Sequence, residues 1–184
     1  PSVKDYSAYV NPFIGTGGHG HTFPGAVVPH GMIQPSPDTR IDGWDACSGY
    51  YYDDNTINGF SHTHVSGTGC CDYGDVLLMP TVGKPQYLTT DPESQKLVYA
   101  SAFSHENETA EPGYYSVFLD TYQVKAEITA TKRGAIHRYT FPESTESVFI
   151  IDLDYSLQRQ TNYEMEIEVI SDTEICGQKK TTYW

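Results

Sequence analysis

The residues best suited to chemistry are two pairs of histidines in the first half of the chain. His19 and His21 are separated by one glycine, and His62 and His64 are separated by one threonine. On an extended segment this H-x-H spacing places both imidazoles on one face, which suits a metal site. Both pairs lie in glycine-rich stretches, where backbone can approach a ligand closely.

A metal site of the cupin kind has a very similar H-x-H opening, which is followed within a few residues by a glutamate. Here no carboxylate follows His21 until Asp38, so the third ligand is missing from its expected place. The spacing therefore favours histidines that hydrogen-bond within the loops or to a ligand, and we expect no metal ligands in this chain. A cupin-like metal-binding β protein is kept as an alternative.

Trp44 is one of two tryptophans and stands between Gly43 and Asp45 in a polar loop. Two interpretations stay open: a tryptophan of the core, or an exposed indole that serves as a platform. Sugars stack their C–H faces on aromatic rings, while carboxylates, imidazoles and backbone groups bind their hydroxyls. The tyrosine run that starts at Tyr50 is typical of a segment that is half core and half surface.

Two pairs of aspartates are further candidates for acid–base chemistry or calcium binding. Asp72 and Asp75 form one pair, and Asp152 and Asp154 form the other. Neither pair is specific, because Asp-x-Asp in an acidic protein is usually solvated surface. The chain has no nucleophile elbow, phosphate-binding loop, zinc-protease motif or dinucleotide fingerprint.

The composition excludes several classes of protein. The 184 residues carry 11 Lys+Arg against 24 Asp+Glu, a net charge of −13, so the basic footprint of a nucleic-acid binder is missing. No apolar run approaches the length of about 18 residues that a membrane helix needs. With 16 Gly, 11 Pro and 13% aromatic residues, the chain is neither a coiled coil nor a disordered segment. An acidic, mainly β domain remains.

The second half of the chain has the pattern of antiparallel strands joined by short turns. We expect strands at residues 114–119, 124–130, 135–141, 147–153 and 164–170. The run at 147–153 is continuously apolar, which predicts a strand covered on both faces. The sequence therefore predicts an all-β fold, a large antiparallel β-sandwich with long glycine-rich loops.

The cysteines and the last residues of the chain say less about the fold than the strand pattern does. Cys47, Cys70, Cys71 and Cys176 match no zinc pattern, and two alternatives stay open: mostly buried free thiols, or bridges from the adjacent pair to the other two. The last residues, 181–184, have strand composition, so we expect the domain to be incomplete at its C-terminus.

Several long motifs, in order along the chain, carry a family resemblance. They are NPFIGTGGHGHTFPGA (11–26), PHGM (29–32), QPSPDT (34–39), GW (43–44), SGY (48–50), GFSHTHVSGTG (59–69), DYGD (72–75), HENE (105–108), PGYY (112–115) and HRYTFP (137–142). Together they resemble the N-terminal part of glycoside hydrolase family 92, the calcium-dependent exo-acting α-mannosidases. The resemblance covers nearly the whole chain.

The resemblance implies that residues 1–184 are the N-terminal β-sandwich domain, of the supersandwich type, of a two-domain enzyme. A catalytic (α/α)6 barrel is expected downstream, and it would hold the acid, the base and most of the calcium environment, so no catalytic residue is assigned here. The sandwich would contribute sugar-binding residues: Gly17, Gly18, His19, Trp44, Asp45, His62 and His64.

The resemblance also implies partners and a location. Mannose-containing glycans and the chain's own C-terminal barrel are the expected partners, and the expected location is periplasmic, extracellular or at the cell surface. The loops at 15–25, 40–52 and 59–72 are expected to form the apolar surface that faces the barrel and the sugar, with Phe23, Trp44, Tyr50 and Phe60. A free-standing carbohydrate-binding module is the main alternative.

Overall fold

The computed structural model describes residues 4–67, 69–84 and 97–182, and its helical elements are short 3₁₀ turns. The elements are η1 (Ser7–Tyr9), β1 (Ser36–Asp38), η2 (Trp44–Ala46), β2 (Thr56–Ile57), β3 (Gly59–Ser61), β4 (Leu77–Val82), β5 (Ser101–Ala102), η3 (His105–Asn107), β6 (Glu108–Glu111), β7 (Tyr114–Leu119), β8 (Val124–Ala130), β9 (Ala135–Thr140), β10 (Ser147–Asp152), η4 (Leu157–Arg159), β11 (Asn162–Ser171) and β12 (Glu174–Thr181). Strands and loops therefore carry the fold.

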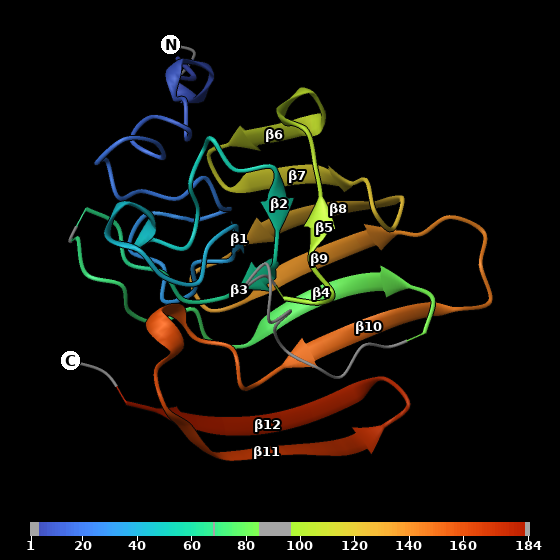
Figure 1. Cartoon of the computed structure of the whole chain (residues 1–184). Helices are drawn as coiled ribbons and strands as arrows, with labels where there is room; N and C mark the ends of the chain where they lie inside the picture. Colours follow the sequence, from blue (N-terminus) through green and yellow to red (C-terminus); the bar gives the residue numbers. More distant parts are fainter. Residues whose placement is uncertain (1–3, 68, 85–96, 183–184) are drawn as a thin grey trace.

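The strands form antiparallel sheets, as the sequence predicts. One four-stranded sheet has the order β1-β3-β4-β10 and another has the order β6-β7-β8-β9, with two-stranded pairs β2-β5 and β11-β12. Tyr139 of β9 packs against Phe60 of β3 and Phe149 of β10, at ring-centroid distances of 6.2 and 5.4 Å, so the two four-stranded sheets are neighbours. Figure 1 shows the β11–β12 hairpin beyond β10, at the far side from β6.

The β7–β8–β9 meander follows directly from its alternating sequence. Val124, Ala126 and Ile128 of β8 point into the core, whereas Lys125 and Thr129 are exposed. Ala126 pairs with Val117 of β7 and with Tyr139 of β9, so the apolar sides of the three strands share one face. The expected turn at residues 131–134 joins β8 to β9, with the Thr131 N–H donating to the Gly134 carbonyl at 2.8 Å.

The core lies between this meander and the short β2–β5 ribbon, which crosses the long strands in Figure 1. Ile57 of β2 and Phe103, just after β5, belong to the same buried cluster as Val117 and Met79. Each fully buried aliphatic side chain of this kind contributes roughly 1.5–3 kcal/mol relative to an exposed one. The ribbon therefore fixes the segments on either side of it to the larger sheets.

The expectation that residues 147–153 are covered on both faces is wrong. β10 lies at the end of the order β1-β3-β4-β10 and pairs with β4 alone among the described strands. Phe149 is 44% exposed. β10 is therefore an edge strand, and Phe149 stays partly exposed although its ring packs against Tyr139 of β9.

Two further expectations are corrected by burial. Tyr50 and Phe60 are core residues rather than part of an exposed apolar surface, because Phe60 packs against β7 and β9. Cys47 and Cys71 are buried, whereas Cys70 and Cys176 are exposed, so half of the cysteines rather than most are interior. Burial raises the pKa of the Cys71 thiol to about 12. Tyr183 and Trp184, expected to continue a strand, lie outside the described residues.

Candidate functional site

Trp44 stands on the surface at the start of η2, with 59% of its area exposed. The interpretation of Trp44 as a core residue is therefore wrong. The next residue of the turn is Asp45, whose carboxylate is also accessible. An indole of this kind offers a flat apolar face with polar groups beside it, which is the combination that a sugar ring requires.

Two histidines of the glycine-rich loop flank the indole. The His19 ring lies 5.3 Å from the Trp44 ring, and the buried His21 ring meets it edge-on at 4.3 Å. His19 Nδ1 also hydrogen-bonds the Asp45 carboxylate. The structure thus brings together two segments that the sequence singled out separately, the Gly17–His19 loop and the Trp44–Asp45 turn.

The loop reaches this position because its backbone folds tightly on itself. The Gly20 N–H donates to the Gly17 carbonyl and the Thr22 N–H donates to the Gly15 carbonyl, both at 3.2 Å. A Cβ at Gly20 would lie 2.0 Å from the Gly15 carbonyl oxygen, so a larger residue does not fit there. The loop therefore presents the peptide groups around Gly17 and Gly18 beside the exposed imidazole.

The loop that contains the second histidine pair reaches the same place through Gly69. A Cβ at Gly69 would lie 3.1 Å from Trp44 Nε1 and 3.2 Å from His21 Cε1. The Gly67 N–H donates to the His21 carbonyl at 2.6 Å. Three glycine-rich segments thus converge around one exposed indole.

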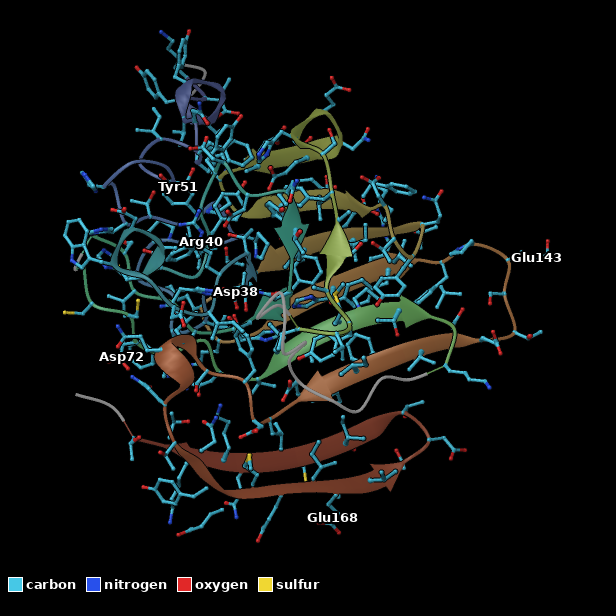
Figure 2. All side chains as sticks on the ribbon, in the orientation of Figure 1. Asp38, Arg40, Tyr51, Asp72, Glu143 and Glu168 are labelled. Atoms are coloured by element: carbon cyan, nitrogen blue, oxygen red, sulfur yellow. The ribbon has the colours of Figure 1, made fainter. Side chains whose placement is uncertain are left out.

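His64 occupies a different environment, deep under these loops. Its Nε2 lies 2.7 Å from Asp38 Oδ1, with both side chains 0% exposed, and its Nδ1 lies 2.7 Å from the Gln34 carbonyl. The imidazole is therefore held on both sides by hydrogen-bonding partners. Asp38 lies in the interior of the molecule (Figure 2). This pair ties β1 to the segment after β3.

His62 is half-buried and lies next to His137 of β9. His62 Nδ1 lies 2.8 Å from the Val76 carbonyl, and the two Nε2 atoms are 3.0 Å apart. Burial lowers the pKa of His62, and burial together with the nearby His62 lowers the pKa of His137 to about 3. The predicted site residues therefore divide into a surface group and an interior group, and their contact with sugar stays a prediction.

The aspartate pairs named from the sequence are used in structural contacts. Asp75 pairs with Lys179 at 2.9 Å and accepts the Thr63 hydroxyl at 3.0 Å. Asp152 accepts the Tyr99 hydroxyl and the backbone N–H groups of residues 154 and 155. In the part of the chain that the structure describes, no three His, Cys, Asp or Glu side chains gather to hold a metal ion.

Sequence reasoning missed a buried polar cluster near the glycine-rich loop. Glu108 accepts hydrogen bonds from Tyr50, Tyr115 and His105, and the His105 ring stacks on Tyr52. The only signal for it was the HENE motif at residues 105–108, which carries no spacing rule of its own. His105 and Tyr115 lie within seven residues of Glu108, but Tyr50 is 58 residues away, so no local pattern identifies the complete cluster.

Comparison with known proteins identifies the family of this arrangement. The profile of the glycosyl hydrolase family 92 N-terminal domain matches residues 9–184. The chain belongs to this family. Family 92 N-terminal domains are also found in the solved structures that superpose on this one.

The structural similarity is close over almost the whole chain. A family 92 α-mannosidase of Bacteroides thetaiotaomicron, solved in complex with mannoimidazole, superposes with a TM-score of 0.87 and 42% identity over 95% of this chain and 23% of its own. The inverting family 92 mannosidase of the same species superposes with a TM-score of 0.73 and 30% identity over 95% of this chain and 23% of its own. These superpositions confirm the predicted fold.

A secreted glycosidase of Arthroderma benhamiae, itself uncharacterized, is 29% identical over 174 residues, which are 92% of this chain and 22% of that protein. The family 92 domain described here thus spans about a quarter of the length of its relatives. Its described residues include no helix long and apolar enough to cross a membrane.

Proposed function

We propose that the full-length protein is an exo-acting, inverting α-mannosidase that trims mannose from glycans, and that this domain supplies part of its sugar site. The observation that carries the proposal is the exposed Trp44, flanked by His19 and Asp45 on a family 92 domain. A relative with 42% identity is a family 92 α-mannosidase solved with mannoimidazole, which supports mannose as the sugar.

Each surface residue has a role in this proposal. The Trp44 indole stacks on the C–H face of the sugar ring, and the His19–Asp45 pair binds hydroxyls beside it. The peptide groups of Gly17 and Gly18 add hydrogen bonds at short range. His62 and His64 hold the loop behind this surface, because their ring nitrogens already face interior partners.

Catalysis belongs to a second domain in this proposal. An inverting glycosidase needs an acid and a base about 6.5–9.5 Å apart, with room for a water molecule. We assign both carboxylates, and the calcium ion, to an (α/α)6 barrel that follows the present domain. The domain described here then contributes binding free energy, which accelerates the reaction where the contacts strengthen in the transition state.

The same proposal includes a location and substrates. The secreted relative from Arthroderma benhamiae supports export from the cytoplasm, to the periplasm or the cell exterior. Mannose-containing glycans are the substrates, and the barrel of the same chain is the partner of the loop surface.

Replacement of the indole tests the proposal. In the full-length protein Trp44→Ala should raise the KM for an α-mannoside roughly tenfold, equivalent to about 1.4 kcal/mol of lost stacking, with a smaller effect on kcat. Ile136→Ala is the matched control, because Ile136 is also an exposed apolar residue but lies on β9. A wild-type protein that binds α-mannosides without hydrolysing them would instead indicate a carbohydrate-binding module.

A further inference from the structure

A buried carboxylate lies behind the glycine-rich loop. Glu108, the first residue of β6, has a side chain that is only 1% exposed. It accepts hydrogen bonds from Tyr50 at 3.0 Å, from Tyr115 at 2.6 Å and from His105 Nδ1 at 2.6 Å. A buried carboxylate is tolerated only when such donors replace its water, so the three donors are held in fixed positions.

One connection leads from Glu108 to the loop through Tyr50. The Tyr50 ring packs against Phe13, with a centroid distance of 6.5 Å. The Phe13 carbonyl accepts both the N–H and the hydroxyl of Thr16, at 3.1 and 2.8 Å. The turn that begins the glycine-rich loop is therefore anchored to a ring whose own hydroxyl is fixed by Glu108.

A second connection runs through His105. Its ring stacks on Tyr52 with a centroid distance of 4.2 Å and an interplanar angle of 9°. The Tyr52 N–H donates to the Thr16 carbonyl at 3.0 Å. A Cβ at Gly17 would lie 3.6 Å from the Tyr52 Cβ, so Tyr52 touches the loop at the residue that precedes the exposed segment.

Both connections meet at Thr16, which is buried and directly precedes Gly17, Gly18 and His19. We propose that His105 and Glu108 are a positioning pair, which sets the place of the glycine-rich loop beside Trp44 through Tyr52 and Tyr50. The inference rests on the proposed function, because the loop positioned in this way is the proposed sugar-binding loop. Neither residue contacts the sugar itself in this scheme.

The decisive variants act on the stacked rings rather than on the buried carboxylate, since Glu108→Gln endangers folding. Tyr52→Ala and His105→Ala remove the stack in the full-length protein, whereas Tyr52→Phe and His105→Phe keep an aromatic ring in place. Hydrogen exchange of the amides of residues 16–22 reports the order of the loop, and the amides of β8 serve as the internal reference.

The alanine variants should speed exchange in residues 16–22 about tenfold and leave β8 unchanged, as expected for local loosening. Their KM for an α-mannoside should rise roughly tenfold while kcat changes less than about twofold. Tyr52→Phe should behave as the wild type, whereas His105→Phe keeps the stacked ring but loses the hydrogen bond to Glu108 and should recover only part of the loss.

The inference is overturned if Tyr52→Ala leaves loop exchange and KM at wild-type values, or if the loop and β8 lose protection together. Failure of the proposed function has a different signature, because the wild-type protein would then neither bind nor hydrolyse an α-mannoside. In that case the exchange comparison still decides whether the pair positions the loop.

Discussion

At the scale of single residues, His62 and His137 form a half-buried pair, and one placement of their ring protons lets every nitrogen make its hydrogen bond. His62 Nδ1–H donates a hydrogen bond to the Val76 carbonyl, so His62 Nε2 is left to accept a hydrogen bond from His137 Nε2–H. His137 Nδ1 then accepts the hydroxyl of Tyr139 at 2.8 Å. Both imidazoles are neutral in this chain of hydrogen bonds.

This neutrality predicts a loss of stability in acid. Burial holds the pKa of His137 at about 3, below its ordinary value of 6.5, and lowers the pKa of His62 as well. The unfolded chain therefore binds protons that the folded chain does not, and the free energy of unfolding should fall as pH drops from about 6.5 towards 3. Each such histidine adds a slope of up to about 1.4 kcal/mol per pH unit, measurable by urea unfolding.

His137→Phe should flatten this pH profile, since it removes one of the two imidazoles. His30→Asn is the matched control, because His30 is exposed and asparagine tolerates its positive φ of 57°. Identical slopes in His137→Phe and wild type would show that the pair does not sense pH.

At the scale of elements, the alternating strands between residues 114 and 171 were predictable, whereas the long strand β12 and the short strands were not. The alternation of β8 and the turn at residues 131–134 were readable from local sequence, because a side chain's face follows from period two. β2 and β5 have two residues each, too few to show any period. The apolar run of β10 has the same composition whether one face or both faces of the strand are covered, so the sequence did not show which of the two applies.

For the candidate site too, some residues could be named from the sequence, whereas the contacts between them follow only from the fold. Gly17 and His19 were named as candidates through the family resemblance, and Trp44 also through the local signal of an isolated tryptophan in a polar loop. The contacts between them, and those of Glu108 with Tyr50, join segments more than twenty residues apart. Only the fold brings such residues together.

The tight turn of the glycine-rich loop gives an element-scale prediction. Gly20→Ala should disorder this loop at a cost of about 1–3 kcal/mol, because its Cβ would overlap the Gly15 carbonyl at 2.0 Å. Thermal unfolding should show a lower Tm, and hydrogen exchange should be faster in residues 15–22 than in the wild type.

Gly134→Ala is the control for added bulk, since the nearest atom to a new Cβ there is the Thr131 hydroxyl at 3.8 Å. Equal Tm values for the two variants would contradict the close approach at Gly20.

At the scale of the whole molecule, exposed apolar side chains lie on the terminal hairpin as well as on the glycine-rich loops, where Trp44 is 59% exposed. The exposed apolar side chains of β11 and β12 are Tyr163, Met165, Ile167, Val169, Ile170 and Ile175. A cleft of about 230 Å³ lies beside them, lined in part by Leu78, Ile151 and Leu153. Exposed apolar side chains gathered on one hairpin often mark a contact surface.

The purified 184-residue chain should therefore self-associate through the hairpin. Val169 is 72% exposed and is therefore the first residue to replace. The double variant Val169→Lys, Ile170→Thr should shift sedimentation towards the monomer. Ile136→Lys places the same charge on β9 and serves as control. Association that persists in the double variant would place the contact elsewhere.

If sugar binding and catalysis belong to different domains, the 184-residue chain should have no hydrolytic activity by itself. Three carboxylates that the sequence singled out are engaged in contacts within the described chain: Asp75 is paired with Lys179, Asp152 accepts Tyr99, and Asp45 is bound to His19. Loss of acid–base catalysis removes a factor of about 10²–10⁴ for each group. We therefore expect the 184-residue chain to release no detectable nitrophenol from an aryl α-mannoside, while the full-length protein does so. Cleavage by the short chain that disappears on substitution of one of these aspartates would place the catalytic machinery in this domain instead.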